Sequence, residues 1–197
     1  GHTRWATHGE QSDRNSQPHT SGNGNLKIIH NGIIENYGTI KQTLLSKGHT
    51  FNSDTDTEVL IHLIEEILEV TGLDLREAVR VALNRVVGAY AIVIMSAEEP
   101  DLLIAARKGS PMVIGVGKGE YFVASDATPI VEYTKNVIYL NDNEIAYLRR
   151  EDLLIKNIDN TVQTPYIQEL DLKLDALEKG GFDHFMIKEI YEQPRSI

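Results

Sequence analysis

The hydrophobic and polar positions divide the chain into a helix-rich first half and a strand-rich second half. Apolar side chains recur at helical spacing over residues 55–68 and 75–87, which predicts two amphipathic helices. A shorter helix is expected over residues 37–46, ended by Gly48. From Gly88 onward, short apolar runs between turn residues predict strands at 90–96, 102–106, 113–116, 121–124, 137–140 and 144–148.

This order of elements indicates the fold class. Regular short strands are typical of antiparallel sheet, and helices grouped before strands favour an α+β layered sandwich over a doubly wound parallel sheet. A further strand is expected over residues 26–30. Taken by itself, the Asn31-Gly32 pair after it predicts a hairpin turn that ends this strand.

Two further stretches complete this pattern. The glycine-rich residues 115–119 lie between two predicted strands, and no Ser or Thr follows their Gly-Lys pair, so a hairpin turn is favoured over a nucleotide-binding loop. Residues 162–181 have mixed charge and are expected to wind over the surface. A last helix is predicted over residues 184–192.

Composition narrows the classes of function. The 197 residues, with 41% hydrophobic and 24% charged side chains, suit one globular domain. A net charge of -10 argues against nucleic-acid binding, because phosphate backbones attract clustered Lys and Arg. The longest apolar run, residues 89–95, is far shorter than the roughly 20 residues of a membrane span. We therefore expect a cytoplasmic protein without nucleic-acid or membrane partners. The absence of cysteine excludes disulfides and thiolate metal sites.

The first nine residues combine Arg, Trp, Thr and two His, a density typical of a site. A core strand would alternate apolar and polar positions, whereas only Trp5 and Ala6 are apolar here. Arg4 is suited to read a carboxylate, because its planar fork donates parallel hydrogen bonds to both oxygens. A solvated surface ion pair is the default alternative for a single Arg.

Five stretches in order carry a family resemblance: residues 1–9 (GHTRWATHG), 30–36 (HNGIIEN), 53–59 (SDTDTEV), 107–111 (RKGSP) and 188–194 (KEIYEQP). Together they resemble the glutaminase domain of the glutamine–fructose-6-phosphate aminotransferases, which are class II glutamine amidotransferases of the Ntn-hydrolase fold. The resemblance covers essentially the whole chain. It implies a four-layer αββα sandwich of two antiparallel sheets.

The resemblance also implies a domain organisation. Members of this family use an N-terminal cysteine as nucleophile, and this chain has none. Residues 1–190 are therefore expected to be a glutaminase-domain fragment, incomplete at the N-terminus and inactive by itself. Residues 191–197 would begin the linker to a sugar isomerase domain that is missing here. Because a lost strand would leave an unpaired sheet edge, we expect self-association.

Catalytic roles are implied for Asn31 and Gly32. In relatives the corresponding Asn side chain and Gly amide form an oxyanion hole, which needs donors fixed where negative charge develops. Gly32 suits this role because it allows close approach of the backbone. Gln17 stands where many relatives have His, which leaves open the role of that position in loop closure.

Substrate contacts are implied for five residues. Asp56 would accept the α-ammonium group of glutamine, while Arg4, with Thr7, would bind the α-carboxylate. Trp5 would form a wall of the pocket, with a buried structural role as the alternative. His8 would be a pocket residue or a hydrogen-bonding spacer.

Simpler interpretations compete for some polar residues. Thr55 and Glu58 form a capping box, so helix capping alone could explain the acidic segment around Asp56. Calcium is disfavoured, because Val59 stands where a calcium loop needs glycine. His19 and His30 are expected to be structural, and no metal site is predicted.

The resemblance implies hydrolysis of glutamine to glutamate without cofactor, with the ammonia used to convert fructose 6-phosphate to glucosamine 6-phosphate. Two alternatives stay open. One is another amidotransferase of the same fold, serving purine or asparagine synthesis, against which residues 4–8 and 189–194 weigh. The other is a non-catalytic glutamine-binding or interaction module.

Overall fold

The computed structural model describes residues 1–4, 6–170 and 181–196, and the predicted pocket residue Trp5 lies outside them. Its helices are η1 (Asp13–Asn15, a 3-10 turn), α1 (Tyr37–Ser46), α2 (Asp56–Thr71), α3 (Leu75–Leu83) and α5 (Phe185–Ser196). Its strands are β1 (His19–Thr20), β2 (Leu26–Ile34), β3 (Gly88–Ser96), β4 (Leu103–Lys108), β5 (Val113–Val116), β6 (Tyr121–Ala124), β7 (Asn136–Tyr139), β8 (Glu144–Arg149), β9 (Asp152–Asn157), β10 (Val162–Gln163) and β11 (Gln168–Glu169).

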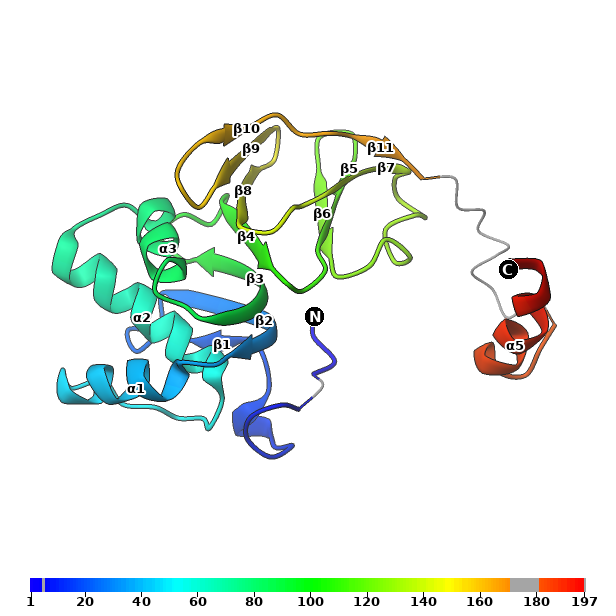
Figure 1. Cartoon of the computed structure of the whole chain (residues 1–197). Coiled ribbons are helices and arrows are strands. Elements are labelled where there is room, and N and C mark those ends of the chain that lie inside the picture. The colour runs from blue at the N-terminus through cyan, green and yellow to red at the C-terminus, as the bar shows by residue number, and fades with distance from the viewer. Residues whose placement is uncertain (5, 171–180, 197) are drawn as a thin grey trace.

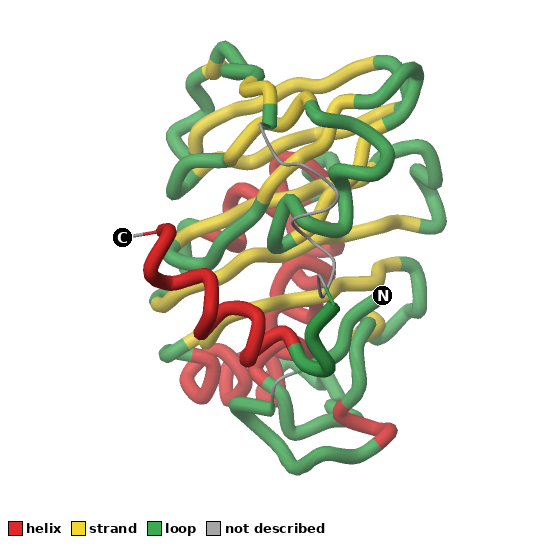
Figure 2. Tube along the Cα trace, turned by 90° about the vertical axis from the view of Figure 1, so that its right-hand side faces the viewer, coloured by secondary structure: helices red, strands yellow, loops and turns green. Residues whose placement is uncertain are grey.

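The strands form two antiparallel sheets. The large sheet has the order β1-β2-β3-β4-β8-β9-β10, and the small sheet has the order β11-β7-β5-β6. Helices α1, α2 and α3 cover one face of the large sheet (Figure 1). Seen from the side, the strands cross the molecule in roughly one direction, with α1, α2 and α3 behind them (Figure 2). The predicted α+β class is confirmed.

Alternation along the strands builds a core on each side of the large sheet. On β3, Ile92 and Ile94 are buried in the core beneath the helices, whereas Ala91 belongs to the core between the two sheets. This double burial explains why residues 91–94 are apolar without a break. A strand with one solvated face would alternate with polar residues instead.

The small sheet is also covered on both faces. Ile114 and Ile138 face the large sheet, while the neighbouring Val113 and Val137 pack beneath residues 127–134 on the outer side. That segment consists of short helical turns held by backbone hydrogen bonds such as Ile130 N to Ala127 O at 2.9 Å. The order of layers is therefore helices, large sheet, small sheet and helical turns, in agreement with the predicted four-layer sandwich.

The structure corrects the predicted end of the strand at residues 26–30. Asn31 and Gly32 do not form a hairpin turn, because β2 continues to Ile34. Asn31 lies opposite Ala91, and Gly32 lies opposite Tyr90 on β3. Pairing along the whole of β3 outweighs the local turn preference of Asn-Gly.

Other boundaries differ less. The predicted helix at 37–46 and the hairpin at 115–119 are confirmed, the latter joining β5 to β6. The second amphipathic helix ends at Leu83 rather than at residue 87. Strand β9 was not predicted, and two short strands, β10 and β11, interrupt the tail that was expected to wind over the surface.

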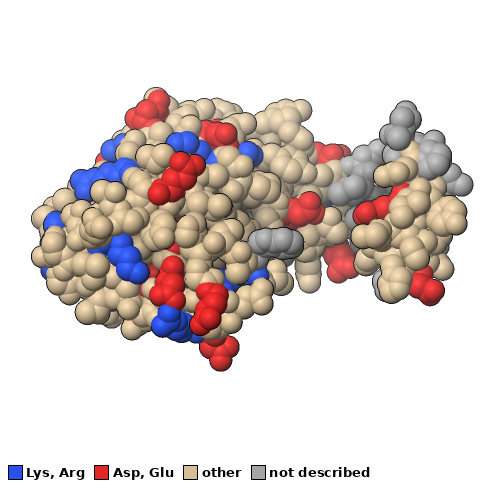
Figure 3. Space-filling model, turned by 60° about the horizontal axis from the view of Figure 1, so that its bottom comes forward, with Lys and Arg blue, Asp and Glu red and all other residues tan. Residues whose placement is uncertain are grey.

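Helix α5 lies apart from the two sheets (Figure 1). Several of its apolar side chains are exposed, among them Phe185, Met186, Ile190 and Tyr191. Within the described residues, none of the helices is long and apolar enough to cross a membrane. On the face shown in Figure 3, acidic and basic side chains are interspersed.

Candidate active site

A pocket of about 310 Å³ lies where residues 2, 4, 7 and 8, strand β2 and the start of helix α2 meet. Its size suits a small-molecule ligand. Its lining residues are His2, Arg4, Thr7, His8, Gln17, His30, Asn31, Gly32, Ile33, Thr55, Asp56 and Thr57. All the predicted site residues that the structure describes are thus brought together, although they come from three separate segments.

His2 fixes the orientation of the Asn31 side chain. The backbone N–H of Arg4 donates to His2 Nδ1 at 3.0 Å, so the neutral ring carries its proton on Nε2. That Nε2 donates to Asn31 Oδ1 at 2.6 Å. Because the side-chain oxygen of Asn31 is engaged by His2, its Nδ2 group is the part of the amide that can donate to a ligand.

Gly32 cannot be replaced by a larger residue without moving the backbone. Its φ angle is +133°, and a β-carbon at this position would lie 2.1 Å from the carbonyl oxygen of Ala89. Only glycine adopts this conformation without strain. At Gly32, strand β2 therefore lines the pocket with backbone atoms alone, next to the side-chain amide of Asn31.

Asp56 supplies a buried carboxylate at the first position of α2. Its Oδ2 accepts a hydrogen bond from the backbone N–H of Ile34 at 2.8 Å, which ties α2 to β2. Its Oδ1 lies 4.0 Å from His8 Nδ1. The His8 ring packs edge-on against Tyr37, with the ring centres 4.8 Å apart. His8 Nδ1 is buried without a hydrogen-bond partner among the described residues, so a donor group between His8 and Asp56 would satisfy both.

Arg4 holds the N-terminal loop in shape. Its guanidinium donates to the backbone carbonyls of His8, Gly9 and Glu10 at 2.8, 3.1 and 3.0 Å. Arg4 itself has a positive φ angle of +47°. A guanidinium has more donors than these three carbonyls use, so Arg4 can support the loop and still donate to a ligand in the pocket that it lines.

Gln17 braces the strand behind the pocket. Its side-chain oxygen accepts from the backbone N–H of His30 at 2.6 Å, and its side-chain nitrogen donates to the carbonyl of the same residue at 2.9 Å. His30 Nδ1 lies 3.1 Å from the hydroxyl of Thr57 on α2. Burial lowers the pKa of His30, so the ring is neutral at pH 7. The side-chain amide of Gln17 thus braces strand β2, a role that the sequence alone did not predict.

The start of α2 is rigidly held, which positions Asp56 and Thr57. The Thr55 hydroxyl accepts from the backbone N–H of Glu58 at 3.3 Å, which is one half of the predicted capping box. The other half is not formed, because the Thr55 N–H donates to Ser53 Oγ and not to Glu58. The Glu58 carboxylate accepts from the backbone amides of Asn52 and Ser53. Burial alone would raise the pKa of Glu58, but the His62 ring, the Ser53 hydroxyl and these amides outweigh it and bring the pKa to about 2.

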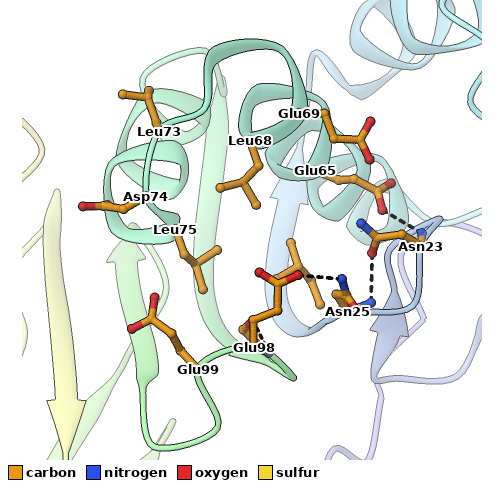
Figure 4. A pocket seen from close by; sticks show the side chains of 12 residues that line it. Asn23, Asn25, Glu65, Leu68, Glu69, Leu73, Asp74, Leu75, Glu98 and Glu99 are labelled. Carbon is orange, nitrogen blue, oxygen red and sulfur yellow. Dashed lines mark hydrogen bonds between the residues drawn. The ribbon is translucent and has the colours of Figure 1, made fainter.

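A second pocket, of about 360 Å³, lies at the other end of α2, beside α3 and the ends of β2 and β3. Figure 4 shows five carboxylates around it, those of Glu65, Glu69, Asp74, Glu98 and Glu99. Such a lining repels a ligand that carries its own carboxylate. It therefore does not compete with the first pocket as a site for an amino acid.

Sequence reasoning identified Asn31 and Asp56 as pocket residues, but it did not find the residues that hold Asn31 and strand β2 in position. His2 lies 29 positions from Asn31, and Gln17 lies 13 positions from His30. Neither pair has a regular spacing that would reveal the contact. The crowding of polar residues in the first nine positions was the available signal for His2.

Comparisons with known proteins identify the family of the chain. Residues 2–132 match the sequence model of a glutamine amidotransferase domain family. The chain is 55% identical over 194 residues to a glutamine–fructose-6-phosphate aminotransferase [isomerizing] of Chlorobaculum tepidum, covering 98% of this chain and 32% of that protein. It is 48% identical over 198 residues to the protein of the same name from Pyrococcus horikoshii, covering 100% of this chain and 33% of that protein. The chain thus spans about a third of the length of these relatives.

The solved structures agree at the level of the fold. The glutamine phosphoribosylpyrophosphate amidotransferase of B. subtilis, complexed with ADP and GMP, matches with a TM-score of 0.67 and 28% identity, over 82% of this chain and 35% of that one. This likeness supports the predicted Ntn-hydrolase-like fold, and the matches confirm the resemblance carried by the five motifs. The chain belongs to the glutamine amidotransferase domain family.

Proposed function

We propose that this chain forms the glutamine site of a glutamine–fructose-6-phosphate aminotransferase. Its identity to relatives of that name is 55% and 48%, against 28% to the phosphoribosylpyrophosphate amidotransferase. This difference favours amino-sugar synthesis over purine synthesis. The parent protein would use the ammonia from glutamine to convert fructose 6-phosphate to glucosamine 6-phosphate.

The observation that carries the proposal is the pairing of a buried carboxylate with an oriented amide in one pocket. Asp56 would bind the α-ammonium group, and Arg4 with Thr7 would bind the α-carboxylate. The side-chain carbonyl of glutamine would then receive hydrogen bonds from Asn31 Nδ2 and from the Gly32 amide. We retain Trp5 as a pocket wall, and His8 as a polar neighbour of the ammonium group.

The proposed chemistry is nucleophilic acyl transfer. A cysteine thiol gives its proton to the free α-amine of its own residue and attacks the amide carbon, so negative charge gathers on the amide oxygen beside Asn31 and Gly32. The α-amine then gives the proton to the amide nitrogen, the C–N bond breaks, and ammonia leaves as a γ-glutamyl thioester forms. Water then releases glutamate and regenerates the thiol. Since this chain contains no cysteine, the nucleophile would come from outside it, and we expect this chain alone to bind glutamine without hydrolysing it.

The assembly and location of the parent protein are also proposals. We assign residues 1–190 to the amidotransferase domain and residues 191–197 to the start of the linker toward a sugar isomerase domain. Helix α5 crosses this proposed boundary. We place the protein in the cytoplasm, and we expect this chain to self-associate through exposed apolar surface such as that of α5.

The proposal is tested on the natural full-length protein by competition between L-glutamine and two analogues. One analogue, 4-carbamoylbutanoate, lacks the α-ammonium group, and the other, L-glutamine α-amide, lacks the α-carboxylate. Each removes a charge-assisted contact, so we expect roughly tenfold or greater loss of affinity for either. Equal affinity for all three would overturn the assignment of Asp56 and Arg4. Binding of glutamine without any glutamate release would favour the non-catalytic module.

A further inference from the structure

A cluster of three side chains that could hold a metal ion lies outside the glutamine pocket. His62 and Glu65 stand one turn apart on α2, and His49 follows α1. His49 Nδ1 lies 3.1 Å from His62 Nδ1, and His62 Nδ1 lies 3.3 Å from Glu65 Oε2. The third side of this triangle, from His49 Nδ1 to Glu65 Oε2, measures 3.8 Å.

These separations match the edges of a coordination tetrahedron. Zinc binds His nitrogen and carboxylate oxygen at about 2.0–2.2 Å, so two ligands at tetrahedral angles are about 3.3–3.6 Å apart. The three atoms therefore need shifts of only a few tenths of an ångström to share one ion. Two nitrogens and one oxygen are also the donor set found in open zinc sites.

Carboxylates on the far sides of both rings direct the nitrogen lone pairs inward. His49 Nε2 lies 2.9 Å from Glu66 Oε2, and His62 Nε2 lies 3.8 Å from Glu58 Oε1. Each contact favours the proton on Nε2, which leaves both Nδ1 atoms as acceptors. Two lone pairs and the Glu65 carboxylate then converge on one point, an arrangement that a cation stabilises.

The Glu65 carboxylate is fixed before any ion binds. It accepts from the backbone amides of Gly22 and Asn23 at 2.9 and 2.7 Å, and Figure 4 shows it turned toward Asn23. A β-carbon on Gly22 would lie 2.9 Å from Glu65 Oε2 and 3.3 Å from the His62 ring, so glycine permits this close approach. An open hollow of about 270 Å³ beside the cluster would admit water as a fourth ligand.

We propose that His49, His62 and Glu65 bind a divalent transition-metal ion of the zinc class, with water completing the tetrahedron. This differs from the sequence-based expectation of no metal site. None of the three residues lines the glutamine pocket. The ion would join three segments: the loop after α1, the middle of α2 and, through Glu65, the turn at Gly22. Its role would be to brace the layer of helices.

The test uses the natural full-length protein, freed of metal with a chelator and then titrated with Zn²⁺ against a chromophoric competitor. We expect one tight site whose affinity falls more than about 100-fold in His49→Gln, which removes a ligand. Glu66→Gln, which leaves the three ligands in place but removes the carboxylate that pairs with His49 and with Lys47, should cost about 10- to 100-fold. The matched control is His184→Gln, because His184 is exposed and lies far along the chain from the cluster.

Two further readouts identify the site independently of activity. Co²⁺ should give the visible absorption bands of a tetrahedral complex in the unmodified protein and in His184→Gln, but not in His49→Gln. Zn²⁺ should raise the unfolding temperature of the unmodified protein and leave that of His49→Gln nearly unchanged, because binding to the folded state stabilises it. Absence of Zn²⁺ binding, or equal binding in His49→Gln, would overturn the proposal.

Discussion

At the scale of single residues, the pocket depends on side chains that use one polar atom for a hydrogen bond within the protein. Asp56 uses one oxygen for the Ile34 amide, and Asn31 uses its oxygen for His2. Both keep their other polar atom for a ligand, so each side chain is held in position before binding. The motifs identified Asp56 and Asn31. They could not identify their anchors, because those contacts arise only when distant segments fold together.

Replacing Asp56 by Asn tests the residue-scale argument. The amide has nearly the same shape but no charge, so a bound ammonium group would lose a charge-assisted contact. We expect roughly a 10- to 100-fold loss of glutamine affinity, measured by calorimetry on the natural full-length protein. Asp54→Asn is the matched control, because Asp54 is exposed and pairs with Arg14. Similar affinities in the two variants would contradict the role of Asp56.

At the scale of elements, periodicity predicted the helices and most central strands, because their apolar positions face a core. Local propensity failed at Asn31-Gly32, where nine-residue pairing with β3 extends the strand. It also missed β10 and β11, which have only two residues each and show no alternation. Such edge strands exist because a longer neighbour offers hydrogen bonds, and their own sequence carries little signal.

Replacing Gly32 by Ala tests the fit of β2 against β3. The added methyl group would collide with the Ala89 carbonyl at an unfavourable φ angle, so we expect a loss of at least about 2 kcal/mol in unfolding free energy. Gly38→Ala is the matched control, since Gly38 lies in α1 with open space around it. That change should be neutral or stabilising by up to about 1 kcal/mol. Equal unfolding free energies of Gly32→Ala and Gly38→Ala in urea denaturation would contradict the close approach of Gly32 to the Ala89 carbonyl.

The contact between β2 and α2 should respond to acid through His30. In the unfolded chain the ring takes up a proton at its ordinary pKa of 6.5, whereas burial lowers the pKa of His30 in the folded chain. The unfolded state therefore binds more protons below that pH, and stability should fall as the pH drops through 6.5. In His30→Gln this fall should be smaller than in the unmodified protein, as measured by urea denaturation from pH 8 to 5. An identical pH dependence in both would show that His30 is not the responsible group.

At the scale of the whole molecule, the four layers follow from burial of both sheets on both faces. The sequence predicted this architecture through the family resemblance, since periodicity alone does not show which sheets stack. It could not place α5 relative to the sheets, and several apolar side chains of this helix are exposed: Met186 is 73% exposed and Tyr191 is 68% exposed. Surface of this kind is typical of a contact with another domain or another copy.

Self-association is the corresponding prediction for the 197-residue chain. We expect the mass measured by light scattering to increase with protein concentration. Replacing Met186 and Ile190 by Lys should reduce that increase, because both are exposed on α5 and apolar contact there would be lost. A monomeric mass at every concentration would exclude self-association, and an unchanged increase in the variant would assign it to another surface.

The central claim is that Asn31 stabilises the negative charge that forms on the glutamine amide. The most direct measurement is glutamate release by the natural full-length protein and by its Asn31→Ala variant, with the exposed Asn136→Ala as control. We predict that kcat falls by roughly 10²- to 10³-fold in Asn31→Ala, while KM changes little and the control keeps full activity. An unchanged kcat in Asn31→Ala would contradict the account.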